Sequence, residues 1–197
     1  MVSSLIVKEK VAHIFKSITL NSNDLEFITK KFVLIHVKKG ELLIQQGEEV
    51  TSQFYVVDGC LRTYQLEESG KESTIQFAIQ DWWISDYIAL WTPQKSVLNV
   101  ACIKEANLLK ISAEDLEQIY NTIPEVESFF RKKLEKAFVR QEKRILSILT
   151  KSAKERYLDF LHTYPNIEKH LKNYHIASYL GITTESLSRI RKEIAKS

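Results

Sequence analysis

A change of pattern along the chain constrains its fold more than any other feature. Between Val33 and Ile111, short runs rich in Val, Ile, Leu, Tyr and Phe alternate with turn residues. Many short strands at regular spacing are typical of a compact antiparallel roll or sandwich. We expect strands over seven of these runs, namely Val33–Val37, Leu42–Gln45, Phe54–Val57, Leu61–Leu66, Ser73–Ile79, Val97–Ile103 and Leu108–Ile111.

One turn signal inside this region is especially strong. Asp58-Gly59 stands between two apolar runs. Asp-Gly in that position predicts a tight β-hairpin, because such a turn requires positive φ angles. We therefore expect the chain to reverse direction at Gly59.

Helical patterns flank the β region on both sides. In the first thirty residues, Val7, Val11, Ile14 and Phe15 recur at helical spacing. Ser112, followed by two acidic residues, predicts the N-cap of a helix that ends near Asn121. The fold class indicated is α+β.

A long helix is expected from Pro124 to about Leu149, because proline suits the first turn of a helix. A stripe at helical spacing follows it: Phe130, Leu134, Ala137, Gln141 and Ile145, widened by Phe138 and Leu149. So much apolar surface favours a partner helix, and hence a homodimer. The alternative is that the stripe packs against the chain's own β region.

The charge of the chain is divided unequally. Residues 1–130 hold 12 Lys and Arg against 18 Asp and Glu, a net charge of −6, whereas residues 131–197 hold 16 against 7, a net charge of +9. The basic part contains three further helical segments, at about 152–163, 166–180 and 184–196. This asymmetry indicates two domains, with the basic one facing a polyanion such as DNA.

The segment from His175 to Lys192 has the layout of a helix-turn-helix. Ala177 is small where two helices cross closely, and Gly181 can adopt the positive φ of the sharp turn. Ile182 fills the inside of the corner, and Thr183 can cap the next helix. The alternative is a helical packing domain with a charged surface.

The last helix has two distinct faces. Leu187, Ile190 and Ile194 share the face that must point into the domain. The exposed face carries the candidate DNA-binding residues Thr184, Glu185, Ser188, Arg189 and Lys192. Arginine can form two hydrogen bonds with guanine, and glutamate can accept one from cytosine. Four cations are candidates for neutralising phosphates: Lys172, Arg191, Lys192 and Lys196.

Nearly the whole chain resembles the Crp/Fnr regulators, and the C-terminal string Ile176–Thr183 with Leu187–Lys192 resembles the form found in their Bacteroidetes branch. In the front half, Lys39-Gly40-Glu41, Gln46-Gly47-Glu48, Phe54–Gly59 and Ser69–Glu72 resemble the family's cyclic-nucleotide-binding roll. The resemblance implies three parts: a cyclic-nucleotide-binding-like sensor domain over 1–123 (an antiparallel β-roll, or double-stranded β-helix), a dimerisation helix over 124–150 and an all-α helix-turn-helix domain over 151–197. It also implies a β wing after the last helix, which is expected to be reduced in a sequence that ends at Ser197.

The nucleotide-binding cassette of the family is altered in this chain. By resemblance, Ser85 stands for its glycine, Asp86 for its glutamate and Tyr87 for its leucine, and the phosphate-binding arginine is replaced by Lys95 or Val97 beside Ser96. Asp86 is one methylene shorter than glutamate, and lysine lacks the bidentate fork of arginine. We therefore expect a degenerate effector pocket at Ser85, Asp86, Tyr87, Lys95 and Ser96. Its aromatic neighbours either form the walls of a site for an unidentified small molecule or simply fill the core: Trp82, Trp83, Tyr87 and Trp91.

Several classes of protein are disfavoured. Neither an enzyme nor a cofactor is expected, because nucleophile, metal-ligand and phosphate-loop motifs are missing from the sequence. Cys60 and Cys102 are expected to be buried thiols. No membrane span or secretory signal is recognised, so we expect a cytoplasmic protein. The predicted function is a sequence-specific, DNA-binding transcription regulator that binds a pseudo-palindrome as a homodimer. The alternative is a ligand-sensing module whose C-terminal helices bind a protein partner.

Overall fold

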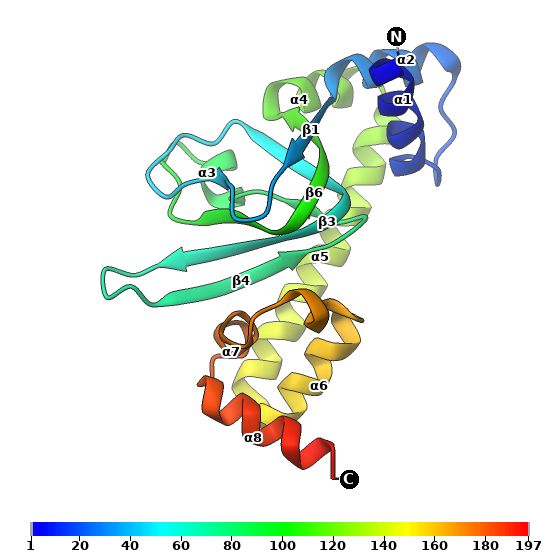
Figure 1. The fold of residues 1–197 in the computed structure, drawn as a ribbon. Coiled ribbons are helices and arrows are strands. Elements are labelled where there is room, and N and C mark those ends of the chain that lie inside the picture. Colours follow the sequence, from blue (N-terminus) through cyan, green and yellow to red (C-terminus); the bar gives the residue numbers. More distant parts are fainter. Residues whose placement is uncertain (1, 197) are drawn as a thin grey trace.

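The computed structural model describes residues 2–196; Met1 and Ser197, the outer ends of the expected domains, lie outside this range. Figure 1 shows a sheet and short helices in the N-terminal part, one long helix that runs behind them, and a compact set of helices at the C-terminal end. In residues 2–196, no helix combines the length and the apolar character that a membrane span requires.

The sheet is antiparallel and has six strands, β1 (Val33–Val37), β2 (Leu42–Ile44), β3 (Ser52–Leu66), β4 (Glu72–Ala78), β5 (Trp83–Ile84) and β6 (Asn99–Ser112). Its main order is β1-β6-β3-β4, while β2 pairs with β6 and β5 with β3. The α+β class and the antiparallel roll expected from the sequence are thus confirmed. Strand β4 is an edge strand, because within this order it pairs only with β3.

The hairpin expected at Asp58-Gly59 was wrong. Strand β3 continues through both residues and bends there, with register shifts against β6 on each side of Asp58. Gly59 has φ +97°, and a Cβ at this position would lie 2.5 Å from the backbone of Ala106. The positive φ therefore serves a bend where two strands cross closely, and the runs on either side belong to one strand.

The front helices form a layer at one end of the sheet. Helices α1 (Val2–Ile14), α2 (Ser22–Lys31) and α4 (Ala113–Thr122) pack with the first turns of α5 (Pro124–Thr150) around one apolar cluster. The side chains predicted from helical spacing, Val7, Val11, Ile14 and Phe15, are all buried in it. Ser112 caps α4 by accepting a hydrogen bond from the Asp115 amide, as predicted.

Helix α5 changes environment along its length. Val126, Phe129 and Phe130 are buried against the front helices. The first turns of α5 therefore pack on their own domain. Farther along, several large apolar side chains are exposed, among them Leu134 (61 %), Phe138 (65 %), Ile145 (58 %) and Leu149 (75 %). The expected stripe is therefore divided between an internal contact and an open face.

The C-terminal helices are α6 (Ala153–Thr163), the 3-10 turn η1 (Ile167–His170), α7 (Asn173–Leu180) and α8 (Thr184–Ile194). The single helix expected over 166–180 is in fact two, because the backbone becomes extended at Leu171 and Lys172. Their apolar cluster also contains Cys60 and Phe77 of the sheet. The sheet and the C-terminal helices thus share one apolar cluster. The two cysteines are buried free thiols, as predicted.

Candidate nucleic-acid interface and effector pocket

Helices α7 and α8 form a helix-turn-helix. Gly181 ends α7 in the left-handed conformation, with φ +68°. Thr183 then caps α8 by accepting a hydrogen bond from the Ser186 amide over 3.2 Å. Ala177 is buried in the apolar cluster that also contains Leu187 and Ile190 of α8. Each of these local roles was predicted from the sequence, because turn and cap residues act through their own backbone.

The two faces of α8 lie as the spacing predicts. Leu187 and Ile190 are buried, and Ile194 packs against the same cluster. The candidate DNA-binding residues line one shallow depression of about 440 Å³, composed of Thr184, Glu185, Ser188, Arg189 and Lys192. Thr184 is half-buried and the other four are exposed. Within residues 2–196, Arg189 and Lys192 have no ion-pair partner, so both cations are available to a ligand.

Glu185 is prepared to accept hydrogen bonds. Its own backbone amide, Thr184 and Thr183 hydrogen-bond to its carboxylate and lower its pKa. The Thr184 hydroxyl lies 3.1 Å from Oε1. Glu185 is also in the first turn of α8, where the helix dipole favours negative charge. The side chain is therefore an ionised acceptor beside the cation Arg189.

Arg191, expected among the phosphate-neutralising residues, has partners inside the domain. Its guanidinium donates to Glu168 (2.7 Å), the Tyr157 hydroxyl (3.0 Å) and Asn173 Oδ1 (2.6 Å). It thus ties α8 to α6, η1 and α7. Spacing puts Arg191 near the exposed face, and only the tertiary contacts reveal its structural role. Lys172 and Lys196, in contrast, are exposed as expected.

His175 occupies the interface between α7 and the sheet. The side chain is buried, and its Nδ1 atom has no hydrogen-bond partner. Burial, with a smaller contribution from the Arg62 charge, lowers its pKa to about 4. His175 is therefore neutral at pH 7.

The expected effector-pocket residues divide into three groups. Ser85, Asp86 and Ser96 are buried together at the start of the short helix α3 (Tyr87–Trp91). Asp86 Oδ1 accepts hydrogen bonds from the Ile88 and Ala89 amides, and its Oδ2 accepts from Ser96 Oγ (2.7 Å) and the Val97 amide (3.1 Å). The Ser85 hydroxyl donates to the carbonyl of Ser52. These polar groups are thus satisfied within the protein, while Lys95 is exposed.

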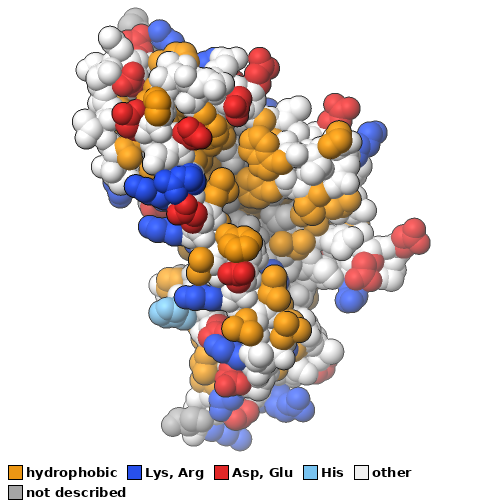
Figure 2. All heavy atoms as spheres, turned by 180° about the vertical axis from the view of Figure 1, so that it is seen from behind, with side chains coloured by type: hydrophobic (Ala, Val, Ile, Leu, Met, Phe, Trp, Pro, Cys, Tyr) orange, Lys and Arg blue, Asp and Glu red, His pale blue; other side chains and the backbone are white. Residues whose placement is uncertain are grey.

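Tyr87 points elsewhere, into a groove of about 860 Å³ between the sheet, α5 and α6. Trp82, Trp83 and Phe130 line the groove with it, and Arg140 reaches in over the Trp82 ring at 4.4 Å. Figure 2 shows hydrophobic side chains gathered along the middle of the rear face, around hollowed surface. Three of the four aromatic residues predicted as pocket walls, Trp82, Trp83 and Tyr87, border this groove, whereas Trp91 is exposed and is not part of its lining. The interior of the roll is filled by another apolar cluster, against which Trp82 packs.

Comparisons with known proteins agree with this architecture. The family model for the cyclic nucleotide-binding domain matches residues 34–122. Transcriptional activator protein Anr of Pseudomonas protegens is 22 % identical over 167 residues, covering 78 % of this chain and 67 % of that protein.

Two solved structures show the same fold over most of the chain. FixK2 from Bradyrhizobium japonicum has a TM-score of 0.72 at 19 % identity, covering 84 % of this chain and 85 % of its own. A Crp/Fnr-family putative transcriptional regulator from Eubacterium rectale has a TM-score of 0.68 at 23 % identity, with 89 % and 84 % covered.

The fold thus defines a protein with a cyclic nucleotide-binding domain, a long connecting helix and a helix-turn-helix. Among the sequence relatives and structural neighbours are several transcriptional regulators. The matched domain, the relatives and the structural neighbours together support a regulator of the Crp/Fnr type, as the sequence resemblance implied.

Proposed function

We propose that this chain is a sequence-specific DNA-binding regulator in which α8 is the recognition helix. The observation that carries the proposal is the exposed row of Glu185, Ser188, Arg189 and Lys192 on one face of α8, in which neither cation forms an ion pair with residues 2–196. An exposed helix face of this width fits the major groove, where such side chains distinguish base pairs. The relative Anr is named as a transcriptional activator, and the same role in the cytoplasm is proposed for this chain.

The active form is proposed to be a homodimer that is joined along α5. Leu134, Phe138 and Ile145 recur at spacings of four and seven, and all are more than half exposed. This period brings the side chains to one seam of a two-helix coiled coil. The two recognition helices then read half-sites about one DNA turn, ~34 Å, apart in a pseudo-palindrome. Sedimentation should show a dimer that Ile145→Glu converts to a monomer, whereas Leu66→Glu, at an exposed apolar residue of β3, leaves it dimeric.

The effector pocket remains part of the proposal in its degenerate form. The carboxylate of Asp86 is already saturated by four protein hydrogen bonds, so it offers little to a ribose hydroxyl. We propose that an effector, where one acts, is a small molecule other than a cyclic nucleotide and contacts the aromatic groove beside Tyr87.

The decisive experiment is selection of genomic DNA fragments by the purified protein, with Arg189→Ala and Lys169→Ala in parallel. Lys169 is an exposed cation of the same domain outside the α8 face. We expect a palindromic motif with wild type and Lys169→Ala and its loss with Arg189→Ala. If wild type enriches no motif, with or without cyclic AMP and cyclic GMP, the proposal fails. The alternative, C-terminal helices that bind a protein partner, then becomes the better explanation.

A further inference from the structure

An irregularity in the edge strand β4 lies beside the helix-turn-helix. Tyr64 pairs with Thr74 and Thr63 with Gln76, so Ile75 is an extra residue that bulges from the ladder. Backbone groups of an edge strand that lack a strand partner need other hydrogen-bond partners. In this chain the partners come from α7 and α5.

Ser178 of α7 provides the first partner. Its Oγ accepts a hydrogen bond from the Thr74 amide at 2.8 Å and donates one to the Glu72 carbonyl at 2.5 Å. The Thr74 hydroxyl lies 3.0 Å from the same atom. One hydroxyl of the helix-turn-helix therefore takes the place of a neighbouring strand along β4.

Arg144 of α5 provides the second partner. Its Nη2 donates to the carbonyls of Thr74 (3.0 Å) and Tyr179 (3.2 Å), and Nη1 donates to the carbonyl of Ile75. The guanidinium also lies over the Tyr179 ring at 4.2 Å. Since Tyr179 belongs to α7, one side chain of the long helix joins the bulge of the sensor sheet to the helix-turn-helix.

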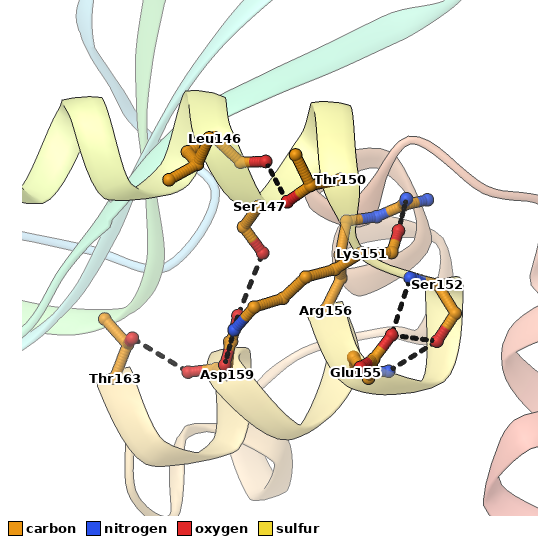
Figure 3. A network of polar contacts seen from close by, with 9 residues as sticks. All are labelled: Leu146, Ser147, Thr150, Lys151, Ser152, Glu155, Arg156, Asp159 and Thr163. Atoms are coloured by element: carbon orange, nitrogen blue, oxygen red, sulfur yellow. Dashed lines mark hydrogen bonds and ion pairs between the residues drawn. The ribbon is translucent and has the colours of Figure 1, made fainter.

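Two further contacts hold the same arrangement. Phe77 of β4 packs against Phe160, Tyr164 and Tyr179 of the C-terminal helices, at centroid distances of 6.1, 5.8 and 5.6 Å. Figure 3 shows the connection between α5 and α6, where Asp159 accepts hydrogen bonds from Ser147 and Lys151 and so ties the start of the domain to the end of α5. The C-terminal domain is therefore attached at two separate places.

We propose that Arg144 and Ser178 are positioning residues that hold the helix-turn-helix on the β4 bulge and thereby set the separation of the two recognition helices in the dimer. The bonded groups lie on the sheet side of α7, while the recognition residues of α8 remain exposed. The orientation is thus held without covering the DNA-reading face. This inference rests on the proposed function and adds the part of the chain that controls its geometry.

The first test needs no DNA. Amide hydrogen exchange, measured residue by residue by NMR, should be about tenfold faster at Thr74 in Ser178→Ala, which removes the acceptor of that amide. In Arg144→Lys the Thr74 amide keeps this acceptor, and its exchange should also rise because α7 is held less firmly on β4. Arg140→Lys is the matched control, because Arg140 is an exposed residue of the same helix. Unchanged exchange at Thr74 in both variants would overturn the proposed joint even if the protein binds DNA.

The second test separates positioning from general damage. Affinity is measured for a full selected palindrome and for a fragment that carries a single half-site. We expect Ser178→Ala and Arg144→Lys each to weaken full-site binding about tenfold and to leave half-site binding within about twofold, because only the full site senses the separation of the helices. The double variant should be no worse than the stronger single one, since both side chains serve one joint.

Each outcome has a distinct meaning. Equal losses on both fragments would show a structural role alone, and unchanged full-site affinity would show that the joint does not set the geometry; both overturn the proposal. If wild type binds neither fragment, the proposed DNA-binding function fails, whereas the exchange experiment still reports on the joint.

Discussion

At the scale of single residues, side chains that resemble ligand contacts can be internal structure instead. Asp86 stands where the resemblance places a ribose-binding carboxylate, yet its oxygens cap α3 and hold the Ser96–Val97 segment. Arg191 stands among exposed cations, yet it joins four segments of the C-terminal domain. Asp86 caps the helix that directly follows it, so part of its role is local, whereas the partners of Arg191 lie on helices that sequence spacing does not connect to it.

The role of Asp86 leads to a stability prediction. Asp86→Ala removes the cap of α3 and leaves the buried Ala89 amide without that acceptor, so the free energy of unfolding should fall by about 2–4 kcal/mol. Lys95→Ala, at an exposed neighbour in the candidate pocket, should change it by less than about 0.5 kcal/mol. Urea denaturation followed by circular dichroism measures both. A loss for Asp86→Ala no greater than for Lys95→Ala would contradict the structural role.

His175 leads to a pH prediction. Its pKa is lowered to about 4 in the folded chain. Between pH 6.5 and 4, His175 therefore binds a proton in the unfolded chain but stays neutral in the folded chain. The free energy of unfolding is therefore unaffected by this group above about pH 6.5. It falls by about 3 kcal/mol as the pH drops toward 4. Arg62, Glu72 and Lys172 are the charged groups that affect it. Denaturation at pH 7 and pH 4.5 should show a smaller difference for His175→Gln, and an unchanged difference would refute the assignment.

At the scale of elements, patterns with a local cause were predictable and long strands were not. Helix α5 begins at Pro124 and α4 is capped by Ser112 as expected, because caps and first turns depend on neighbouring residues. Strands β3 and β6 each absorbed two of the expected runs. The irregular pairing of β3 with β6 around Gly59 depends on its close approach to Ala106, which is far away in sequence, and the same Asp-Gly signal otherwise predicts a hairpin.

The bend at Gly59 is testable by a single methyl group. In Gly59→Ala the added Cβ would meet the Ala106 backbone and the Glu105 carbonyl at 2.5 Å, so two strands must separate. We expect a loss of about 3 kcal/mol or more in the free energy of unfolding. Gly70→Ala is the matched control: it also has positive φ, but its Cβ would meet nothing within 4 Å, and about 1 kcal/mol is expected. Equal losses would show that backbone strain alone, without the strand contact, requires glycine at position 59.

In the candidate site, too, features with a local cause were predictable and contacts between distant elements were not. The face of α8 follows from helical period, and all five expected residues lie together on it. Ser178 and Arg144 carry no signal of their own, since a serine in a helix and an arginine on a basic helix are ordinary. Their contacts exist only because β4 is an edge strand that bulges at Ile75.

At the scale of the whole molecule, the acidic and basic parts of the sequence lie in different regions of the fold. The acidic front half forms the sheet and its covering helices, and the basic remainder comprises most of α5 and the helix-turn-helix. A polyanion is thus attracted to the end that carries α8. Attraction to phosphates and recognition of bases are separate contributions, because only the first releases counterions.

This separation yields a prediction for salt dependence. The logarithm of the binding constant should fall linearly with the logarithm of salt concentration, and Lys172→Ala should reduce the slope by about two for a dimer, one lost phosphate contact per half-site. Arg189→Ala should instead weaken binding to the selected site by about 1–3 kcal/mol per half-site with little change in slope, because its proposed partner is a base. Lys95→Ala, an exposed cation of the sensor domain, is the control and should change neither quantity.

Fluorescence anisotropy from 50 to 200 mM salt measures all three variants. A slope that Lys172→Ala leaves unchanged would place this cation away from the phosphates, and a slope change in Arg189→Ala with no loss of sequence preference would move Arg189 from base recognition to backbone contact.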